Sequence, residues 1–360
     1  MKKEELLSVK IDKPDKAVYK KARENWDLIS KPIDGLGDFE DLVSRIAAMK
    51  GSADYSLIER YLIVFCADNA IVEEGVSQCG QQITRQVAVA LSKNESSSNT
   101  LAKSVNAKVV AVDVGINFKD KIEGIIDRKV AFESKNFLKE PSMSDDEVIA
   151  AINTGIEMVA GLKAKTADII LTGEMGIGNT TTSTAVLCSL LNLDVDLITG
   201  KGAGLNDEGL LRKKKVIREG VEKYRSELES IGDLKERSFA TLRCLGGLDI
   251  AALCGVFIGG AIYKIPVVID GLISAVSALL AEYMVSGSKD YMIASHEGRE
   301  HGVKEVLELL GKKAYIKGNM ALGEGTGALM LLPLIDSSLY FYKNALRFEN
   351  AGIENYERFN

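Results

Sequence analysis

The residues best placed to do chemistry begin with a glycine-rich turn, GEMGIGNTTT, at residues 173–182. Gly176 and Gly178 permit a tight backbone path that residues with a Cβ resist. Asn179 and Thr180 then supply a cap and a hydroxyl donor where a helix should begin. A helix N-terminus presents unpaired N–H groups and partial positive charge, so the turn is a candidate anion site. The alternative is a tight strand-to-helix turn that binds no ligand.

The same turn lacks the residues of two common nucleotide-binding motifs. It has no lysine as required by G-x-x-x-x-G-K-[ST], and its glycines do not fit G-x-G-x-x-G, which argues against a nucleoside triphosphatase and a dinucleotide dehydrogenase. A second glycine-rich turn contains Gly202 and Ala203, and the basic run 212–215 follows it. Lys213 is a candidate phosphate partner, although such a run is more often a solvated helix face.

Two glutamates and a histidine are candidates for the remaining chemistry. Glu324 lies between two glycines in an uncharged stretch, where loss of water would make its carboxylate a stronger base. Alternatively, Glu324 stabilises the first turn of the following helix as an anion. Glu174 could hold a sugar hydroxyl or a developing positive charge, or simply be a helix-entry carboxylate. His296 could contact a ligand, or be a hydrogen-bonded residue at a strand end.

Together these groups suit the transfer of a phosphorylated sugar. The chain offers one anion site and one candidate base on a distant loop, without a nucleophilic triad. With two histidines, and five cysteines that never show C-x-x-C spacing, no metal site is predicted. In such a transfer the protein mainly positions the reactants, while one carboxylate takes up a proton.

A sheet must position these residues, because most of them follow short apolar runs. Strands are predicted at 61–67, 108–114, 169–172, 266–269, 290–294 and 313–317. A capping box from Ser144 to Glu147 opens a helix that leads into the third of these runs. Several strands end in Gly, Asp or Glu before a helix. This rhythm predicts an α/β fold with a doubly wound, mostly parallel Rossmann-like sheet, whose working edge is at the strand carboxyl ends.

The ends of the chain and two loops give further expectations. Residues 1 to about 55 are polar and helix-prone and are predicted to form a small flanking subdomain. The last twenty-five residues, 336–360, are predicted to form a terminal helix. Thr84 is a possible helix cap. Residues 92–99, SKNESSSN, are predicted to form a polar loop.

Composition and charge exclude several functions. The net charge of −6 gives no general attraction to phosphate backbones, so nucleic acid is not predicted as a partner. The longest charge-free apolar run, 250–263, is too short for a membrane span, and the N-terminus has no apolar signal core. Scattered cysteines favour the reducing cytoplasm over a disulfide framework.

Two segments, GEMGIGNTT at 173–181 and LGEGTGA at 322–328, resemble the signatures of the nicotinate-nucleotide:dimethylbenzimidazole phosphoribosyltransferase family. The resemblance extends in the family's order from about residue 31 to residue 335. Further matching segments are KPIDGLG at 31–37, CAD at 66–68, EGV at 74–76, GGLD at 246–249, PVVIDG at 266–271 and ASH at 294–296.

The resemblance implies an enzyme that moves 5-phosphoribose from nicotinate mononucleotide to an aromatic base, releases nicotinate and inverts the anomeric carbon. The product would be an α-ribazole-type phosphate for the lower ligand of cobamides. No metal or organic cofactor is implied. The family's architecture implies a large Rossmann-like domain (56–335), a small helical subdomain from both chain ends (1–55 plus 336–360) and a homodimer.

The resemblance also assigns roles to residues. Glu324 would be the catalytic base, and Glu174 would act near the ribose. The phosphate and ribose would contact Gly176, Gly178, Asn179, Thr180, Gly202, Ala203 and Lys213. The base pocket would be lined by Met175, Ile177, Leu322, Cys79 and Val87.

Departures from the family pattern fall mainly on the base half of the site. The common Asp-His-Gly-Val is Asp-Asn-Ala-Ile at 68–71, and Ala321 stands where a basic residue is frequent. Val87 replaces a glutamine and Cys79 a serine. A different benzimidazole, a purine or a phenolic ring is therefore an alternative acceptor. Related phenol-activating enzymes pair unlike subunits, so a nucleotide-binding subunit that is not catalytic alone, in a heterodimer, is the alternative function.

Overall fold

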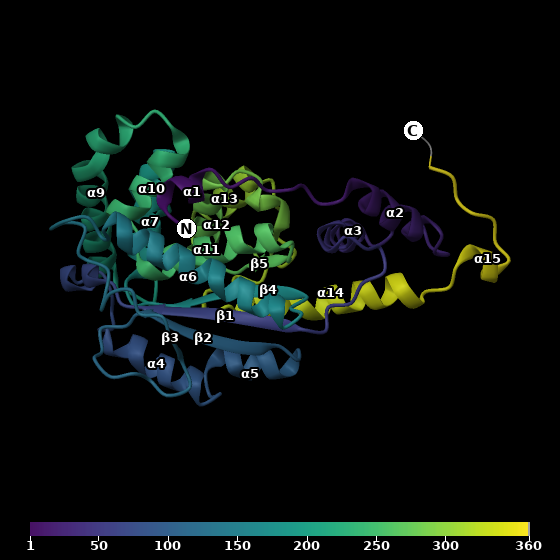
Figure 1. The fold of residues 1–360 in the computed structure, drawn as a ribbon, viewed down its shortest axis with the longest axis horizontal. Helices are drawn as coiled ribbons and strands as arrows, with labels where there is room; N and C mark the ends of the chain where they lie inside the picture. Colours follow the sequence, from purple (N-terminus) through teal and green to yellow (C-terminus); the bar gives the residue numbers. More distant parts are fainter. Residues whose placement is uncertain (359–360) are drawn as a thin grey trace.

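The apolar runs of the sequence form a six-stranded parallel sheet in the computed structural model, which describes residues 1–358 (Figure 1). The strand order is β3-β2-β1-β4-β5-β6, which confirms the predicted doubly wound α/β class. The order reverses between β1 and β4, and doubly wound sheets bind ligands beyond the carboxyl ends at such a reversal. The strands are β1 (Arg60–Ala67), β2 (Lys108–Gly115), β3 (Ile126–Asp127), β4 (Ile169–Met175), β5 (Val267–Ile269) and β6 (Met292–Ala294).

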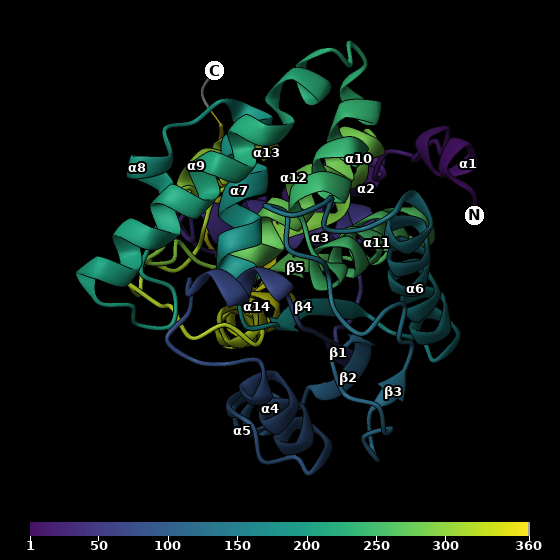
Figure 2. The same cartoon turned by 90° about the vertical axis from the view of Figure 1, so that its left-hand side faces the viewer.

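Strand β1 shows how the sequence divides the core into two halves. Ile63 and Phe65 belong to the apolar cluster on one face of the sheet, whereas Leu62 and Val64 belong to the cluster on the other. Both faces are buried, so the strand is apolar throughout. One face is covered by α4 (Gln82–Ser92), α5 (Ser97–Ser104) and α14 (Thr326–Asn344), and the other by α6 (Asp145–Ala164), α7 (Asn179–Leu191), α10 (Leu234–Leu245), α11 (Leu248–Tyr263) and α12 (Leu272–Met284) (Figure 2).

Shorter or peripheral elements complete this part of the chain. They are η1 (Ala70–Glu74), α8 (Val195–Ile198), α9 (Asp207–Glu229), η2 (Ser288–Tyr291) and α13 (Val303–Leu310). The predicted capping box of α6 is confirmed, because the Ser144 hydroxyl accepts from the N–H of Glu147 at 3.2 Å. In the described part of the chain, residues 1–358, no helix is long and apolar enough to cross a membrane.

Two details of the predicted sheet are wrong. Residues 313–317 do not form a strand, and Ile316 makes only an isolated bridge to His296. Lys313 and Lys317 flank this segment and are mostly exposed, whereas a parallel strand of this sheet is buried on both faces. The sixth strand is instead β3, at the edge beside β2, whose two residues are exposed and too few to form an apolar run.

A close crossing of α6 and α11 fixes the end of the sheet where the site lies. A Cβ on Gly155 of α6 would lie 2.0 Å from the carbonyl oxygen of Ala252, and one on Gly255 of α11 would lie 2.0 Å from that of Ile152. Only glycine allows the two backbones to approach so closely. The first turn of α11, which carries Asp249, is therefore held in a fixed position over the strand ends.

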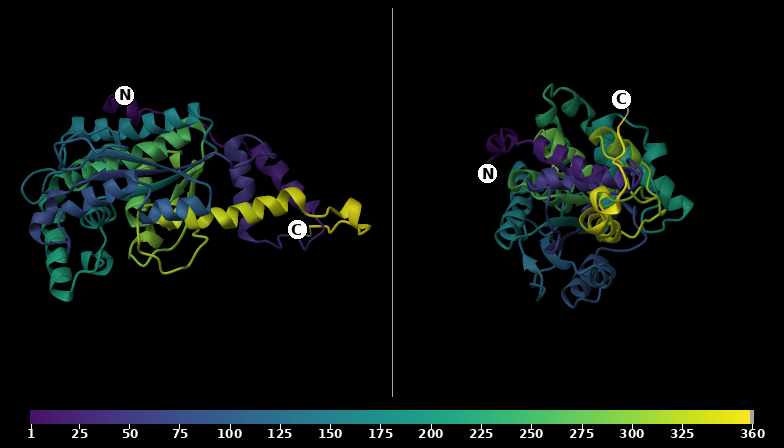
Figure 3. Two further views of the ribbon diagram at one scale, coloured as in Figure 1. Left: turned by 90° about the horizontal axis from the view of Figure 1, so that it is seen from below. Right: turned by 90° about the vertical axis from the view of Figure 1, so that its right-hand side faces the viewer.

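The two chain ends meet in a helical lobe beside the sheet. This lobe contains α2 (Lys16–Asp27), α3 (Asp38–Lys50), the end of α14 and α15 (Phe348–Ala351) (Figure 3). Helix α1 (Lys3–Leu7) lies apart from it, against α10, where Lys3 pairs with Glu236 at 2.8 Å. The division into domains 1–55 plus 336–360 and 56–335 stays a prediction, and α14 runs across its boundary at 335/336.

Three local predictions for helices are corrected. Residues 336–360 are not one terminal helix, because α14 ends at Asn344 and only the short α15 follows within the described chain. Thr84 does not cap α4, since it lies inside the first turn of that helix. Residues 92–99 are not wholly a loop, because Ser96 forms a capping box with Asn99 that starts α5.

Candidate active site

The glycine-rich turn after β4 leads directly into α7 at the reversal point of the sheet. Gly178 has φ +97° and caps α7, and a Cβ there would lie 2.8 Å from a methyl carbon of Val72. The N–H of Ile177 donates to the Thr84 hydroxyl at 3.1 Å, which ties the turn to α4. The turn is thus fixed on this side, and Asn179 and Thr180 at the start of α7 line the cleft.

Asn69, one of the departures from the family pattern, also supports this turn. Its amide donates to the carbonyl of Ile177 at 3.4 Å and accepts from the Ser134 hydroxyl at 2.9 Å. Asn69 therefore holds the outer side of the turn in place. Asp68 beside it does not line the cleft, and burial raises the pKa of its carboxyl group to about 6.

The loop that carries Glu324 has an unusual backbone. Gly323, Glu324 and Gly325 all have positive φ, of 84°, 56° and 80°. A glutamate in this region is strained, and such strain persists where the surrounding structure enforces it, often at functional sites. Its carboxylate lies against α5, where the N–H and hydroxyl of Ser98 donate to it at 3.4 and 3.2 Å.

Asp270, directly after β5, anchors this loop through two hydrogen bonds. Its two carboxylate oxygens accept from the N–H of Gly325 at 3.2 Å and of Ala328 at 2.9 Å. Asp270, not Glu324, therefore satisfies the start of α14, and the Glu324 carboxylate is turned away from its own helix. Burial raises the pKa of Asp270, and the neighbouring His296 opposes that shift.

The two signatures line a single cleft. A Cβ on Gly173 would lie 2.8 Å from the carbonyl oxygen of Glu324, and one on Gly323 would lie 3.1 Å from a carboxylate oxygen of Glu174. Among the predicted site residues, those lining this cleft are Glu174, Met175, Gly176, Ile177, Asn179, Thr180, Gly202, Ala203, Leu322 and Glu324. His296, whose contact with a ligand was one of two interpretations, lines it as well.

Lys213 and Gly178 do not line this cleft but lie directly behind the residues that do. Lys213 is only 1% exposed, and its ammonium donates to the Thr180 hydroxyl at 2.8 Å. Burial lowers the pKa of Lys213 to about 8. A smaller adjoining cavity is lined by Gly178 together with Thr180, Gly202 and Ala203. Lys213 therefore reaches the candidate anion site through Thr180, although it does not line the main cleft.

Cys79 and Val87 do not line the cleft in this structure. Val87, on α4, packs against the apolar cluster on the α4 side of the sheet, and Cys79 lies in the preceding loop, where its N–H donates to Ser77. The contacts of both residues with an acceptor base stay a prediction.

Two carboxylates in the site have no cation beside them. Asn179 donates its amide to Glu174 and, at 2.9 Å, to Asp249. Burial, reinforced by the charge of Asp249, raises the pKa of Glu174 to about 8. Burial likewise raises the pKa of Asp249 to about 6. Such a pair favours a ligand that brings or develops positive charge.

Asp249 and Asp270 are the site residues that the sequence analysis did not single out. Asp270 had a signal, since an acid directly follows an apolar strand. Asp249 had only its place in GGLD, and its contact with Asn179 depends on how α11 meets α7. Within residues 1–358, no group of three or more His, Cys, Asp and Glu side chains is arranged to hold a metal ion.

The fold and site together define a doubly wound α/β protein whose cleft joins a candidate anion site to carboxylates without a nearby lysine or arginine in the described chain. A family model described as "Phosphoribosyltransferase" matches residues 11–353. The chain belongs to this phosphoribosyltransferase family.

Relatives and solved structures share this family over nearly the whole chain. A nicotinate-nucleotide–dimethylbenzimidazole phosphoribosyltransferase of Clostridium tetani is 39% identical over 96% of this chain and 93% of its own length. One of Ruminiclostridium cellulolyticum is 37% identical over 94% of each chain. The crystal structure of CobT from Thermus thermophilus matches with a TM-score of 0.87 and 30% identity, over 94% of this chain and 100% of that one.

Proposed function

We propose that this protein transfers 5-phosphoribose from nicotinate mononucleotide to an aromatic base, dimethylbenzimidazole or a close analogue, to make the α-ribazole-type phosphate of a cobamide lower ligand. The observation that carries this proposal is the shared cleft, in which the anion site of α7 faces the loop of Glu324. The relatives bear names for this reaction.

The phosphate of the nucleotide rests on the first turn of α7. The hydroxyl and backbone N–H of Thr180 donate to its oxygens, and Lys213 behind Thr180 supplies a positive charge. Within residues 1–358, Lys213 forms no ion pair within 4.0 Å, so its charge is available to the phosphate. Gly202 and Ala203 close the other side of this subsite.

The reaction breaks the bond between the anomeric carbon and the nicotinate nitrogen, and that bond's electron pair leaves with nicotinate. Positive charge then grows on the ribose, where Glu174 lines the cleft in place of water and Asp249 lies buried behind it against the Asn179 amide. Glu174 is largely protonated at pH 7 in the free protein, and a nearby positive charge favours its ionised form.

The acceptor base attacks the opposite face of the anomeric carbon through one ring nitrogen, which inverts its configuration. Glu324 takes the proton from the other nitrogen of the heterocycle. Apolar side chains of Met175, Ile177 and Leu322 form the surface against which the aromatic ring stacks. Leu322 is 56% exposed without a ligand, so the base would cover apolar surface as it binds.

A homodimer is supported by the outer face of α14. Met330, Leu334 and Phe341 form an exposed apolar stripe at helical spacing, with Tyr340 71% exposed beside it. An exposed stripe of this kind favours a protein interface. We place the enzyme in the cytoplasm, where its free cysteines would stay reduced.

The test is to incubate the purified chain alone with nicotinate mononucleotide and a panel of bases, and to measure nicotinate release and the ribosylated product. We expect release with dimethylbenzimidazole or another benzimidazole. Tight binding of the nucleotide without turnover on any base would instead support the nucleotide-binding subunit of a heterodimer. The presence of both Glu324 and Glu174 argues against that alternative.

A further inference from the structure

A second cavity, of about 340 Å³, lies where the helical lobe meets the sheet domain. It shares no residue with the active-site cleft. Its walls come from the segment before α2 and the first turn of that helix, the second half of α3, η2 and the loop after α13. The lining residues are Lys13, Pro14, Asp15, Lys16, Tyr19, Arg45, Ala48, Met49, Asp290 and Lys312.

The cavity carries an excess of positive charge. Four basic and two acidic residues line it, and Asp15 already caps α2 by accepting from the N–H of Ala17 at 2.8 Å. Within residues 1–358 none of the four basic side chains, Lys13, Lys16, Arg45 and Lys312, has a carboxylate oxygen within 4.0 Å. Lys13 and Lys16 are exposed, but Arg45 and Lys312 are partly buried. Lys50 and Arg60 are partly buried as well, and they do have such a partner.

Arg45 and Lys312 form the centre of this charge. Arg45 donates only a long bond, 3.4 Å, to the carbonyl of Met292. Burial, with Arg45 next in effect, lowers the pKa of Lys312 to about 7, while Asp290 acts in the opposite direction. In the described chain both cations line the same cavity without an acidic partner within 4.0 Å, and an anion bound there would be attracted to both.

We propose that this cavity binds the phosphate group of a small phosphorylated molecule, with Arg45 and Lys312 as its main partners. Oxyanions are the ligands that guanidinium and ammonium groups bind best. A cavity of this volume is larger than phosphate alone needs, and it lies at the lower end of the range for small-molecule sites. Tyr19, Pro14 and Met49 offer an apolar wall for the organic part of the ligand.

The experiment is a calorimetric titration with inorganic phosphate at constant ionic strength and pH 6.5. We expect two phosphate sites per wild-type chain. Lys213→Met should remove only the phosphate binding at the active site. Lys312→Met should weaken the affinity of the second cavity for phosphate by about tenfold or more, as loss of a charge-assisted hydrogen bond does. Lys289→Met is the matched control, because Lys289 lies on η2 outside the cavity.

A thermal unfolding series guards against misfolded variants and separates the possible ligands. Without phosphate, Lys312→Met should unfold at or above the wild-type temperature, because it removes a poorly compensated charge. Phosphate should raise the unfolding temperature of the wild type through both sites. In Lys213→Met the contribution of the second cavity should remain, whereas in Lys312→Met that contribution should be lost. Repeating the series with nicotinate mononucleotide shows whether a nucleotide phosphate enters this cavity as free phosphate does. A single phosphate site that Lys213→Met abolishes, or an unchanged second site in Lys312→Met, would overturn the proposal.

Discussion

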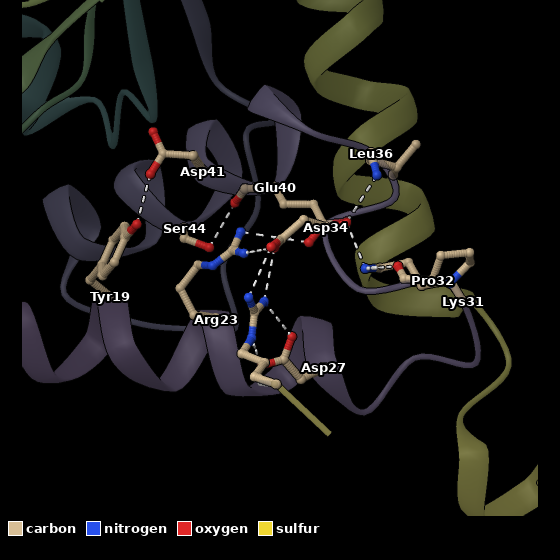
Figure 4. A network of polar contacts seen from close by, with 11 residues as sticks. Tyr19, Arg23, Asp27, Lys31, Pro32, Asp34, Leu36, Glu40, Asp41 and Ser44 are labelled. Carbon is tan, nitrogen blue, oxygen red and sulfur yellow. Dashed lines mark hydrogen bonds and ion pairs between the residues drawn. The ribbon is translucent and has the colours of Figure 1, made fainter. Parts of the chain in front are cut away.

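The helical lobe and the active-site cleft each bury carboxylates, but only the lobe supplies cations for them. In the lobe, Glu40 is fully buried, and its oxygens lie 2.6 Å from the ammonium of Lys31 and 3.6 Å from Arg23 (Figure 4). In the cleft, Glu174 and Asp249 share only the amide of Asn179. Neither has a lysine or arginine within 4.0 Å in the described chain.

This contrast separates a structural charge from a functional one. A buried carboxylate is costly unless a partner compensates it, and Glu40 has that compensation in place. The cluster around Glu40 fixes the 31–37 loop, whose N–H at Leu36 donates to Glu40 at 3.0 Å. The cleft leaves its carboxylates without a cation in the described chain, so a substrate that develops positive charge would itself favour their ionised forms.

The largest effect is expected from Glu324→Gln, which removes the proton acceptor while it keeps the shape of the side chain. Turnover should fall about 10³-fold, the usual contribution of a general base, with little change in affinity for nicotinate mononucleotide. Steady-state kinetics and nucleotide titration measure the two quantities. Ser98→Ala, which removes a hydroxyl donor to Glu324, should have a much smaller effect. A Glu324→Gln variant that turns over at near the wild-type rate would exclude Glu324 as the base.

Glu40→Gln should have the next largest effect, on stability rather than on turnover. Removing one partner of a buried ion pair leaves Lys31 uncompensated, and the free energy of unfolding should fall by about 3 kcal/mol. Urea unfolding followed by circular dichroism measures it. Glu24→Gln is the control, because Glu24 is exposed and its ion pairs are 3.9 Å long. Equal stability of the two variants would contradict a structural role for Glu40.

These predictions also show how far the sequence alone could reach. The runs at 61–67 and 169–172 predicted strands because buried parallel strands are continuously apolar, and Glu324, between two glycines in an uncharged stretch, was a candidate base on a loop. The sequence could not show that Asp270 holds that turn, because the contact joins residues 55 apart. Nor could it show the pairing of Glu40 with Lys31, since buried and solvated charges look alike in sequence. The strand β3 has only two residues, too few to form a recognisable apolar run.

Asp249→Asn should raise the free energy of unfolding, the opposite of Glu40→Gln, and the gain should depend on pH. Burial raises the pKa of Asp249 to about 6, above its value in the unfolded chain, so the folded protein binds the proton more tightly. The wild type should therefore lose stability from this group as pH rises from about 4 to about 6, and remain lower above that range.

The Asp249→Asn variant cannot ionise at this position, so its free energy of unfolding should not fall in this way as pH rises. At pH 7 it should be more stable than the wild type by about 2 kcal/mol, and the difference should vanish near pH 4. Urea unfolding at the two pH values provides the measurement. A variant that is less stable at pH 7 would mean that Asp249 is compensated in the manner of Glu40.

The smallest effect is expected from Arg358→Ala, which tests the exposed edge of the lobe cluster. Arg358 donates to Asp27 and Asp34 at 2.8 to 2.9 Å, and its hydrogen bond is the main cause that lowers the pKa of Asp34 to about 2. Because water and salt screen exposed pairs, the loss should be at most about 1 kcal/mol and should shrink at high ionic strength. Thermal unfolding at two salt concentrations measures it. A salt-independent loss as large as that of Glu40→Gln would show that the cluster acts as one cooperative unit, with its buried and exposed halves equally important.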